Sequence, residues 1–307
     1  MRPSVFVNIA AYRDPDLKAT IRDLLAKAAH PDRITIGMVQ QTRPEDEFAF
    51  YSTEFNGIHI DAQKSKGACW ARHLGYTLYR GEDYILQIDA HMRFADCWDE
   101  EMLAELAACP AAKPMLTTYA PEFAPPNFMH FGGPTIFQAL KFDDDGHVFG
   151  EMRASKFPAS GPRPTALVSG HFMFARAEWI SEVPYDPQLY FFGEEITLAA
   201  RPWTNGWDLF SPSHNLVWHY YLRDGRFRHW DDHGLWGHLD FLSRVRARRL
   251  LGMSEPSDAL IRHPESCTEL DRYGLGAARS LAEYQHFSGI DFQARTITPR
   301  ESNGGIG

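Results

Sequence analysis

The first 120 residues of the chain alternate between short apolar runs and amphipathic segments. Apolar runs of about four to eight residues are typical of buried strands, and apolar positions spaced three and four apart are typical of helices. The pattern predicts strands at 5–10, 33–40, 57–62, 83–89 and 114–119, and helices at 15–29, 66–80 and 97–108. Pro15 suits a first helical turn, and Gly81 suits a helix end. This alternation predicts an α/β fold class: a mixed, mainly parallel sheet with helices on both faces.

The alternation breaks after residue 120. Residues 121–165 are rich in Pro, Gly and Phe, and 143–146 has the composition of a hairpin turn. Further strands are predicted at 135–142, 167–175 and 208–210, and helices at 193–204 and 240–251. The remaining residues are polar and weakly patterned. We therefore expect one compact domain over residues 1–252 and a C-terminal extension over 253–307.

An acid and an imidazole stand two positions apart where the apolar run over 83–89 ends. In an extended backbone, residues i and i+2 point to the same side, so Asp89 and His91 are expected to project together. A carboxylate oxygen and an imidazole nitrogen form a mixed ligand pair for a divalent metal. In open α/β sheets, ligands bind at the carboxyl ends of the strands. The alternative is an Asp and a His that only make local hydrogen bonds at a strand end.

Composition limits the classes of partner. The chain has 307 residues, with 31 Lys and Arg against 40 Asp and Glu and a formal charge of −9, which disfavours nucleic acid as a partner. No apolar run approaches the roughly 20 residues of a membrane span, so no membrane association is predicted. The four cysteines show no C-x-x-C spacing, as expected of reduced thiols in a cytoplasmic protein. Neither G-x-G-x-x-G after the first strand nor G-x-x-x-x-G-K-[ST] is present, which disfavours a dinucleotide-binding fold and a P-loop.

Four further segments accompany the Asp-x-His motif. They are Ala71-Arg72-His73, Phe191-Phe192-Gly193-Glu194-Glu195, Arg201-Pro202-Trp203 and Val217-Trp218-His219. Together they resemble the GT-A glycosyltransferases, in the branch that contains the polypeptide N-acetylgalactosaminyltransferases. The resemblance is closer still to the family that adds N-acetylglucosamine to hydroxyproline on a ubiquitin-ligase adaptor. It covers roughly residues 4–252, and Ala90 stands where that family usually has Ser.

The resemblance implies a metal centre and a nucleotide-sugar donor. Asp89, His91 and His219 would hold Mn²⁺, or Mg²⁺, with the diphosphate of a UDP-sugar completing the coordination. Residues carried over to the donor site are Tyr12 and Arg13 at the uridine, Arg72 near the nucleotide or sugar, and Trp203. A basic segment after His219 contains Arg223, Arg226 and Arg228, which either fold over the diphosphate or form a solvated loop.

The resemblance also implies a catalytic pair. Glu194 falls on the first acid of the galactosaminyl motif and Glu195 on its asparagine, whereas Thr197 replaces the second acid. Glu194 would then bind the donor sugar, and Glu195 either the sugar or the acceptor. The implied reaction is a retaining transfer, in which the leaving phosphate accepts the proton. An inverting reaction would need one of these carboxylates as a base at the acceptor hydroxyl.

The expected function is therefore transfer of a sugar, N-acetylglucosamine by the resemblance, from a UDP-sugar to a hydroxyl of a peptide, protein or small molecule. A first alternative is a nucleotide-sugar-binding protein without turnover. A second is a zinc hydrolase, because His229 and His233 have the i, i+4 spacing of a metal-binding helix. The segment lacks the general base of H-E-x-x-H, which disfavours the hydrolase.

Overall fold

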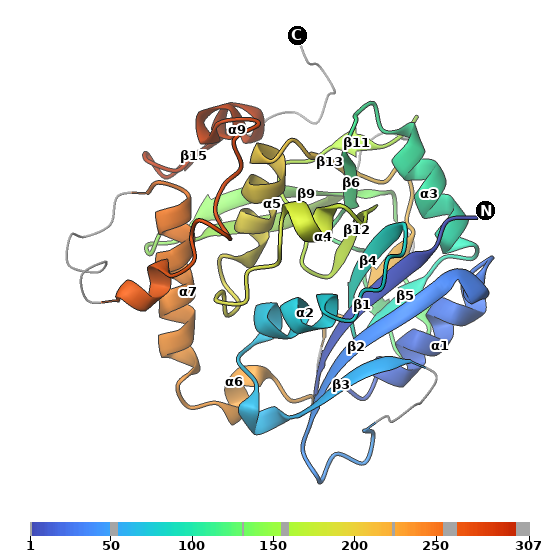
Figure 1. The fold of residues 1–307 in the computed structure, drawn as a ribbon. Coiled ribbons are helices and arrows are strands. Elements are labelled where there is room, and N and C mark those ends of the chain that lie inside the picture. Colours follow the sequence, from blue (N-terminus) through green and yellow to red (C-terminus); the bar gives the residue numbers. More distant parts are fainter. Residues whose placement is uncertain are drawn as a thin grey trace.

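The computed structural model describes residues 2–49, 55–130, 132–154, 160–222, 225–253 and 263–298. Its centre is an eight-stranded sheet with the order β11-β13-β6-β12-β4-β1-β2-β3 (Figure 1). These strands are β1 Val5–Tyr12, β2 Ile34–Thr42, β3 Asn56–Asp61, β4 Tyr84–Asp89, β6 Pro114–Thr117, β11 Arg163–Pro164, β12 Phe172–Arg176 and β13 Asp208–Ser211. Strands β4, β1, β2 and β3 are parallel neighbours, and so are β13 and β6, whereas β12 runs antiparallel to both β4 and β6. The predicted mixed, mainly parallel sheet is confirmed.

Two apolar clusters lie on the two faces of this sheet. Successive side chains of a strand point to opposite faces, so Phe6 and Ile85 join one cluster while Val7 and Leu86 join the other. The helices are α1 Leu17–Lys27, α2 Ala68–Tyr76, α3 Trp98–Ala108, α4 Trp179–Glu182, α5 Glu194–Thr204, α6 His229–Asp232, α7 Trp236–Leu250 and α9 Leu281–Ser288. Apolar residues of α2 and α5 belong to the first cluster, and those of α1 and α3 to the second. Helices therefore cover both faces, as predicted.

Short accessory sheets surround the main one. They pair β5 Met92–Phe94 with β14 Val217–His219, β7 Phe123–Ala124 with β8 Phe128–Met129, β9 Thr135–Phe142 with β10 Val148–Ala154, and β15 Ile290–Asp291 with β16 Thr296–Ile297. Short 3₁₀ turns occur at η1 Pro31–Arg33, η2 Ala62–Lys64 and η3 Pro264–Cys267. The predicted hairpin turn at 143–146 joins β9 to β10 and is confirmed.

Several predicted boundaries were wrong, and each has a local cause. The helix expected to reach residue 80 ends at Tyr76, because the Thr77 hydroxyl donates to the carbonyl of Leu74 and the chain turns there. The strand expected from residue 167 begins at Phe172, because the chain turns just before it, where the N–H of Phe172 donates to the carbonyl of Ser169. The helix expected from residue 240 already begins at Trp236.

The weakly patterned C-terminal residues contain a helix that the prediction missed. The Ser280 hydroxyl accepts from the backbone N–H of Glu283, and the Glu283 carboxylate accepts from Ser280 in return. This capping box is a recognisable start signal for α9. Tyr284 of α9 packs in the same apolar cluster as Trp203 of α5. The division of the chain into residues 1–252 and an extension over 253–307 stays a prediction.

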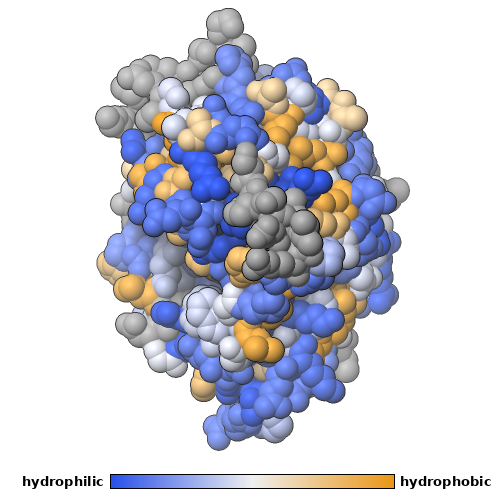
Figure 2. All heavy atoms as spheres, turned by 90° about the vertical axis from the view of Figure 1, so that its left-hand side faces the viewer, coloured by the Kyte–Doolittle hydropathy of each residue, from blue (hydrophilic) through white to orange (hydrophobic). Residues whose placement is uncertain are grey.

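The face that carries α6 and α7 is mostly hydrophilic, with scattered apolar clusters (Figure 2). At the start of α7, Leu235 and Trp236 are exposed, and so is Phe241 within it. Among the described residues, no helix is both long and apolar enough to cross a membrane.

Candidate active site

The expected metal ligands converge although they come from distant parts of the chain. Asp89 ends β4, and His91 follows it at the turn into β5. Strand β14 pairs antiparallel with β5, so that His219 lies directly opposite Met92 in the ladder. The side chains of Asp89, His91 and His219 each offer a ligand atom within 4.8 Å of the other two. The predicted convergence of these three residues is confirmed.

The geometry of this triad suits a divalent cation. The Nε2 atom of His219 lies 3.2 Å from Oδ2 of Asp89, and Nε2 of His91 lies 3.8 Å from the same oxygen. The Nδ1 atom of His91 lies 2.7 Å from Oδ2 of Asp14, so the carboxylate holds the imidazole with Nε2 turned toward Asp89. Metal-binding histidines commonly have such a partner on the other ring nitrogen. Three ligand atoms with one orienting carboxylate are a donor set that fits a catalytic metal.

Arg72 joins the metal triad to the carboxylate of Glu194. Its Nη2 atom donates to Oδ1 of Asp89 at 2.5 Å, and its Nη1 donates to Oε1 of Glu194. The hydroxyl of Tyr185 donates to the same Glu194 oxygen. Burial opposes the ionisation of Asp89, but Arg72 and the two neighbouring imidazoles lower its pKa well below the ordinary value. Asp89 is therefore ionised and ready to bind a cation at neutral pH.

Close packing of α2 against β1 positions Arg72. Gly75 of α2 lies against Asn8 of β1, where a Cβ atom would collide with the Asn8 amide oxygen. The Asn8 amide in turn donates to the carbonyl of Arg72 at 2.9 Å. A residue without a side chain thus brings the helix near enough for Arg72 to reach the sheet edge.

Glu194 and Glu195 open α5 but have different surroundings. Glu194 accepts from Arg72 and Tyr185, whereas Glu195 accepts from the backbone of Gly170. Burial, and after it the charge of Glu194, raises the pKa of Glu195 to about 8. Glu195 is therefore largely a neutral acid near pH 7, able to donate a hydrogen bond. Two buried carboxylates with different hydrogen-bond partners can therefore have different protonation states and different roles at one site.

Gly193, which precedes this pair, has a packing role. Its φ is +95°, and a Cβ atom there would lie 2.7 Å from Cβ of Ala247 in α7. The missing side chain of Gly193 therefore leaves space for α7 and not for a ligand.

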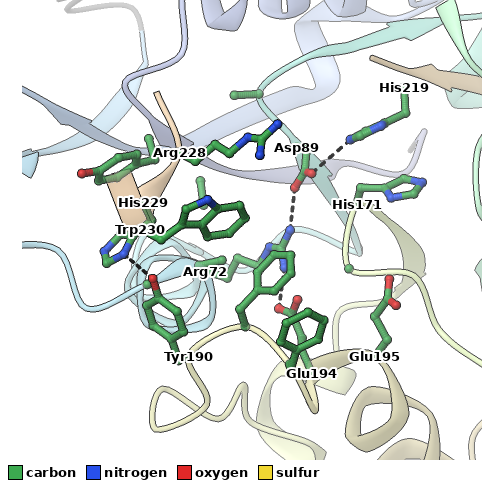
Figure 3. A pocket seen from close by; sticks show the side chains of 18 of the residues that line it. Arg72, Asp89, His171, Tyr190, Glu194, Glu195, His219, Arg228, His229 and Trp230 are labelled. Atoms are coloured by element: carbon green, nitrogen blue, oxygen red, sulfur yellow. Dashed lines mark hydrogen bonds and ion pairs between the residues drawn. The ribbon is translucent and has the colours of Figure 1, made fainter. Parts of the chain in front are cut away.

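These groups line one cavity of about 480 Å³. Figure 3 shows Asp89 and His219 on one side of it, Arg72 below Asp89, and Glu194 and Glu195 on the opposite wall. The rest of the lining includes Tyr12, His171, Phe191, Arg228, His229 and Trp230. Polar groups thus converge at one end of the cavity, and aromatic rings line much of the remainder, an arrangement common in ligand sites.

Sequence reasoning missed Asp14, Tyr185 and His171. The ring of His171 stacks on that of His219, with centroids 4.4 Å apart. Its Nε2 accepts from the backbone N–H of Ala120 at 3.0 Å, and its Nδ1 lies 2.8 Å from the Ser169 hydroxyl. Burial, with the neighbouring His219, lowers the pKa of His171 well below the ordinary value. No local pattern signals these contacts, because they depend on packing between distant segments.

The expected nucleotide-binding residues divide into two groups. Tyr12 and Arg72 line the cavity. Arg13 is not among the lining residues: its guanidinium pairs with Asp46 at 2.7 Å and with Asp232 at 3.0 Å. The hydroxyl of Tyr12 donates to the same Asp232 carboxylate at 2.7 Å. Arg13 thus ties α6 to β1 beside the cavity.

The structure also leaves Trp203 and Arg226 outside the cavity lining. The Trp203 ring stacks on Phe287 of α9 at 5.5 Å, within the core. Arg226 pairs with Asp16 at 2.6 Å and with Asp14 at 3.3 Å. Arg223 lies outside the described residues. Of the three arginines expected at the diphosphate, Arg228 is the one found in the lining.

His229 and His233 do not assemble a second metal site in the described part of the chain. Their rings stack at 3.9 Å. The His229 ring hydrogen-bonds to Tyr190 and Ser65, and that of His233 to the carbonyl of Ala62. The hydrogen bonds of these two histidines therefore hold α6 in place.

Comparison with known proteins identifies the family of this chain. The family described as Glycosyltransferase (GlcNAc) matches the chain over residues 4–56 and 46–294. The chain belongs to this family. The match extends beyond residue 252 into the C-terminal segment. No curated protein matches the chain.

One solved structure, that of GalNAc-T7, shows the same fold as this chain. The structure of GalNAc-T7 with UDP, GalNAc and Mn²⁺ superimposes with a TM-score of 0.64 at 14% identity, covering 93% of this chain and 54% of that one. This chain thus spans about half the length of the GalNAc-T7 chain. S. aureus TarS 1-349 in complex with UDP-GlcNAc matches at a TM-score of 0.48 and 10% identity, over 88% of this chain and 73% of that one. The GT-A fold expected from the sequence is confirmed.

Proposed function

We propose that this glycosyltransferase transfers N-acetylglucosamine from UDP-N-acetylglucosamine to a hydroxyl group, with Mn²⁺ as its metal. The observation that carries the proposal is that Asp89, His91 and His219 open into the same cavity as Glu194 and Glu195. The family description supports N-acetylglucosamine as the sugar. The bound UDP and Mn²⁺ of GalNAc-T7 support the nucleotide and the metal.

Asp89, His91 and His219 would hold the metal at the diphosphate. A bound Mn²⁺ supplies Lewis-acid stabilisation of the negative charge that develops on the leaving phosphate. Arg228 lines the cavity and is the described arginine best placed to pair with that charge. Tyr12 would lie at the uridine, and its hydroxyl is already oriented by Asp232.

Glu194 would bind the donor sugar. Its oxygen already accepts from Arg72 and Tyr185, so the carboxylate is fixed in place before substrate arrives. A fixed negative charge there stabilises the positive charge that grows on the sugar ring as the bond to phosphate breaks. Glu195, with its raised pKa, would donate a hydrogen bond to a sugar or acceptor hydroxyl.

These surroundings favour retention over inversion. An inverting transfer needs an ionised carboxylate that is free to take the acceptor proton. The Oε1 atom of Glu194 already accepts from two donors, and Glu195 has its pKa raised to about 8. Same-face transfer, in which the leaving phosphate oxygen takes the acceptor proton, requires neither residue as a base. Mg²⁺ in place of Mn²⁺, hydroxyproline as the acceptor and a cytoplasmic location stay predictions.

A donor screen tests the proposal without knowledge of the acceptor. UDP release would be measured from the UDP-linked forms of N-acetylglucosamine, N-acetylgalactosamine, glucose and galactose, each with Mn²⁺, Mg²⁺ or a chelator. We expect slow hydrolysis, fastest with UDP-N-acetylglucosamine and Mn²⁺, and none with the chelator. Tight binding of every UDP-sugar without turnover, even with added hydroxyl acceptors, would instead favour a binding protein.

A further inference from the structure

We infer that Arg226 is a positioning residue for the metal centre and acts through Asp14 on His91. This inference rests on the metal site of the proposed function. It changes the role expected of Arg226, which the sequence placed at the diphosphate. It also makes the affinity for metal depend on the segment that follows His219.

One carboxylate connects the arginine to the histidine. Oδ2 of Asp14 lies 2.7 Å from Nδ1 of His91, and Oδ1 of the same group lies 3.3 Å from Nη1 of Arg226. The Asp14 side chain is 1% exposed, so these contacts are shielded from solvent. The two oxygens of Asp14 thus face a metal ligand and a cation.

Arg226 is itself held in place. Its Nη1 also lies 2.6 Å from Oδ2 of Asp16, and its guanidinium lies 4.6 Å from the centre of the Tyr220 ring. Tyr220 directly follows His219, and its backbone N–H donates to the carbonyl of His91 at 3.1 Å. The contacts of Arg226 therefore join the loop after β1 to the segment after β14, and Tyr220 links that segment to the turn after β4.

The physical reason for this arrangement is charge compensation. A metal-binding imidazole is neutral, so it cannot balance the charge of the carboxylate at its Nδ1. A buried carboxylate that loses a cationic partner is strongly destabilised and tends to move out of place. Arg226 supplies a positive charge to Asp14. The carboxylate can then keep the His91 ring oriented and increase its basicity toward the metal.

A thermodynamic consequence follows from this coupling. If the placement of Arg226 strengthens metal binding, metal binding must stabilise the placement of Arg226 by the same free energy. Mn²⁺ alone, without UDP, should therefore stabilise the segment around residues 225–228.

The test is the Kd for Mn²⁺ in the absence of UDP, from the electron paramagnetic resonance signal of free Mn²⁺. Outer partners of metal ligands typically contribute about 10–100-fold in affinity, and we expect Arg226→Gln to weaken binding about tenfold. Asp14→Asn should weaken it at least as much, and the double variant no more than Asp14→Asn alone. Arg226→Lys keeps the charge and should recover most of the affinity.

Arg176→Gln is the matched control. Arg176 is exposed, pairs with Glu178 and lies beside Tyr84, at the opposite end of β4 from Asp89. The Mn²⁺ affinity of the Arg176→Gln variant should equal that of the wild type. Circular dichroism and the Tm would be recorded for every variant. If Arg226→Gln does not fold, hydrogen exchange of the wild-type amides at 225–228 decides the question: Mn²⁺ alone should slow it, and unchanged exchange would contradict the coupling.

The experiment distinguishes a failure of the proposed metal site from a failure of the role inferred for Arg226. If the wild-type protein binds no Mn²⁺, the proposed metal site itself is wrong. If the wild type binds Mn²⁺ and folded Arg226→Gln binds it within twofold of the wild type, the metal site stands and the role of Arg226 is overturned. Equal losses in the Arg226→Lys and Arg226→Gln variants would also contradict charge compensation as the mechanism.

Discussion

The Nε2 atom of His219 lies 3.2 Å from Oδ2 of Asp89, although 130 residues separate the two in the sequence. The β5–β14 ladder produces this contact, because it sets His219 opposite Met92 and therefore beside the turn that carries His91. The short ladder is thus a structural requirement of the proposed metal centre.

Loss of a ligand should abolish metal binding. Asp89→Asn and His219→Ala each remove a ligand atom, and we expect Mn²⁺ affinity to fall by roughly a hundredfold or more, above the range for outer partners. Isothermal titration with Mn²⁺ measures this. His214→Ala is the control, since His214 is an exposed histidine near Glu101. Unchanged affinity in both ligand variants would place the metal elsewhere.

Glu194→Gln should slow transfer without much effect on nucleotide binding. The amide keeps the shape of the side chain but loses the charge that Arg72 and Tyr185 hold toward the sugar. Removing one such stabilising group typically costs about a hundredfold in kcat. Steady-state kinetics with UDP-N-acetylglucosamine, and the Kd for UDP, give the two quantities. If kcat and the affinity for UDP fall by the same factor, Glu194 has a structural role only.

The contribution of Glu195 to the stability of the metal-free protein should decrease as pH rises through neutrality. The pKa of Glu195 is about 8 in the folded protein against an ordinary value of 4.5, so the folded state retains this proton longer than the unfolded state. Between these values the unfolded chain binds fewer protons, and the free energy of unfolding falls as pH rises.

The comparison of wild type with Glu195→Gln isolates this effect. Urea unfolding at pH 5 and pH 8 should show a smaller loss of stability in the variant, because glutamine does not ionise. Parallel pH dependences in the two proteins would mean that Glu195 ionises at its ordinary pKa.

Trp203 should matter for stability and not for the donor. Its ring stacks on Phe287 and also packs near Tyr284, so Trp203→Ala leaves a hole where α5 meets α9. Large-to-small changes of this kind typically lower the free energy of unfolding by about 3–5 kcal/mol. Denaturant unfolding measures the loss, and the Kd for UDP of the folded variant should match the wild type. A weakened UDP affinity in a stably folded variant would restore Trp203 to the donor site.

The local sequence pattern was sufficient for the α/β alternation and for the pairing of Asp89 with His91. Both depend on short-range geometry: strand residues two positions apart share a side, and helical periodicity is visible within a few turns. The paired acids at the start of α5 were visible for the same reason. His219 required the family resemblance, because its own neighbours Trp218 and Tyr220 describe only a buried strand.

Only the tertiary structure decided which charges meet. Arg13 and Arg226 are both arginines near glycosyltransferase motifs, yet the first pairs with Asp46 and Asp232, and the second with Asp14 and Asp16. Arg226 and Asp14 are 212 residues apart in the chain. A long cationic side chain binds whichever carboxylate the fold brings within reach, and burial makes that pairing obligatory. Local sequence patterns report the backbone geometry of each element, whereas the partner of a buried charge depends on how the elements pack together.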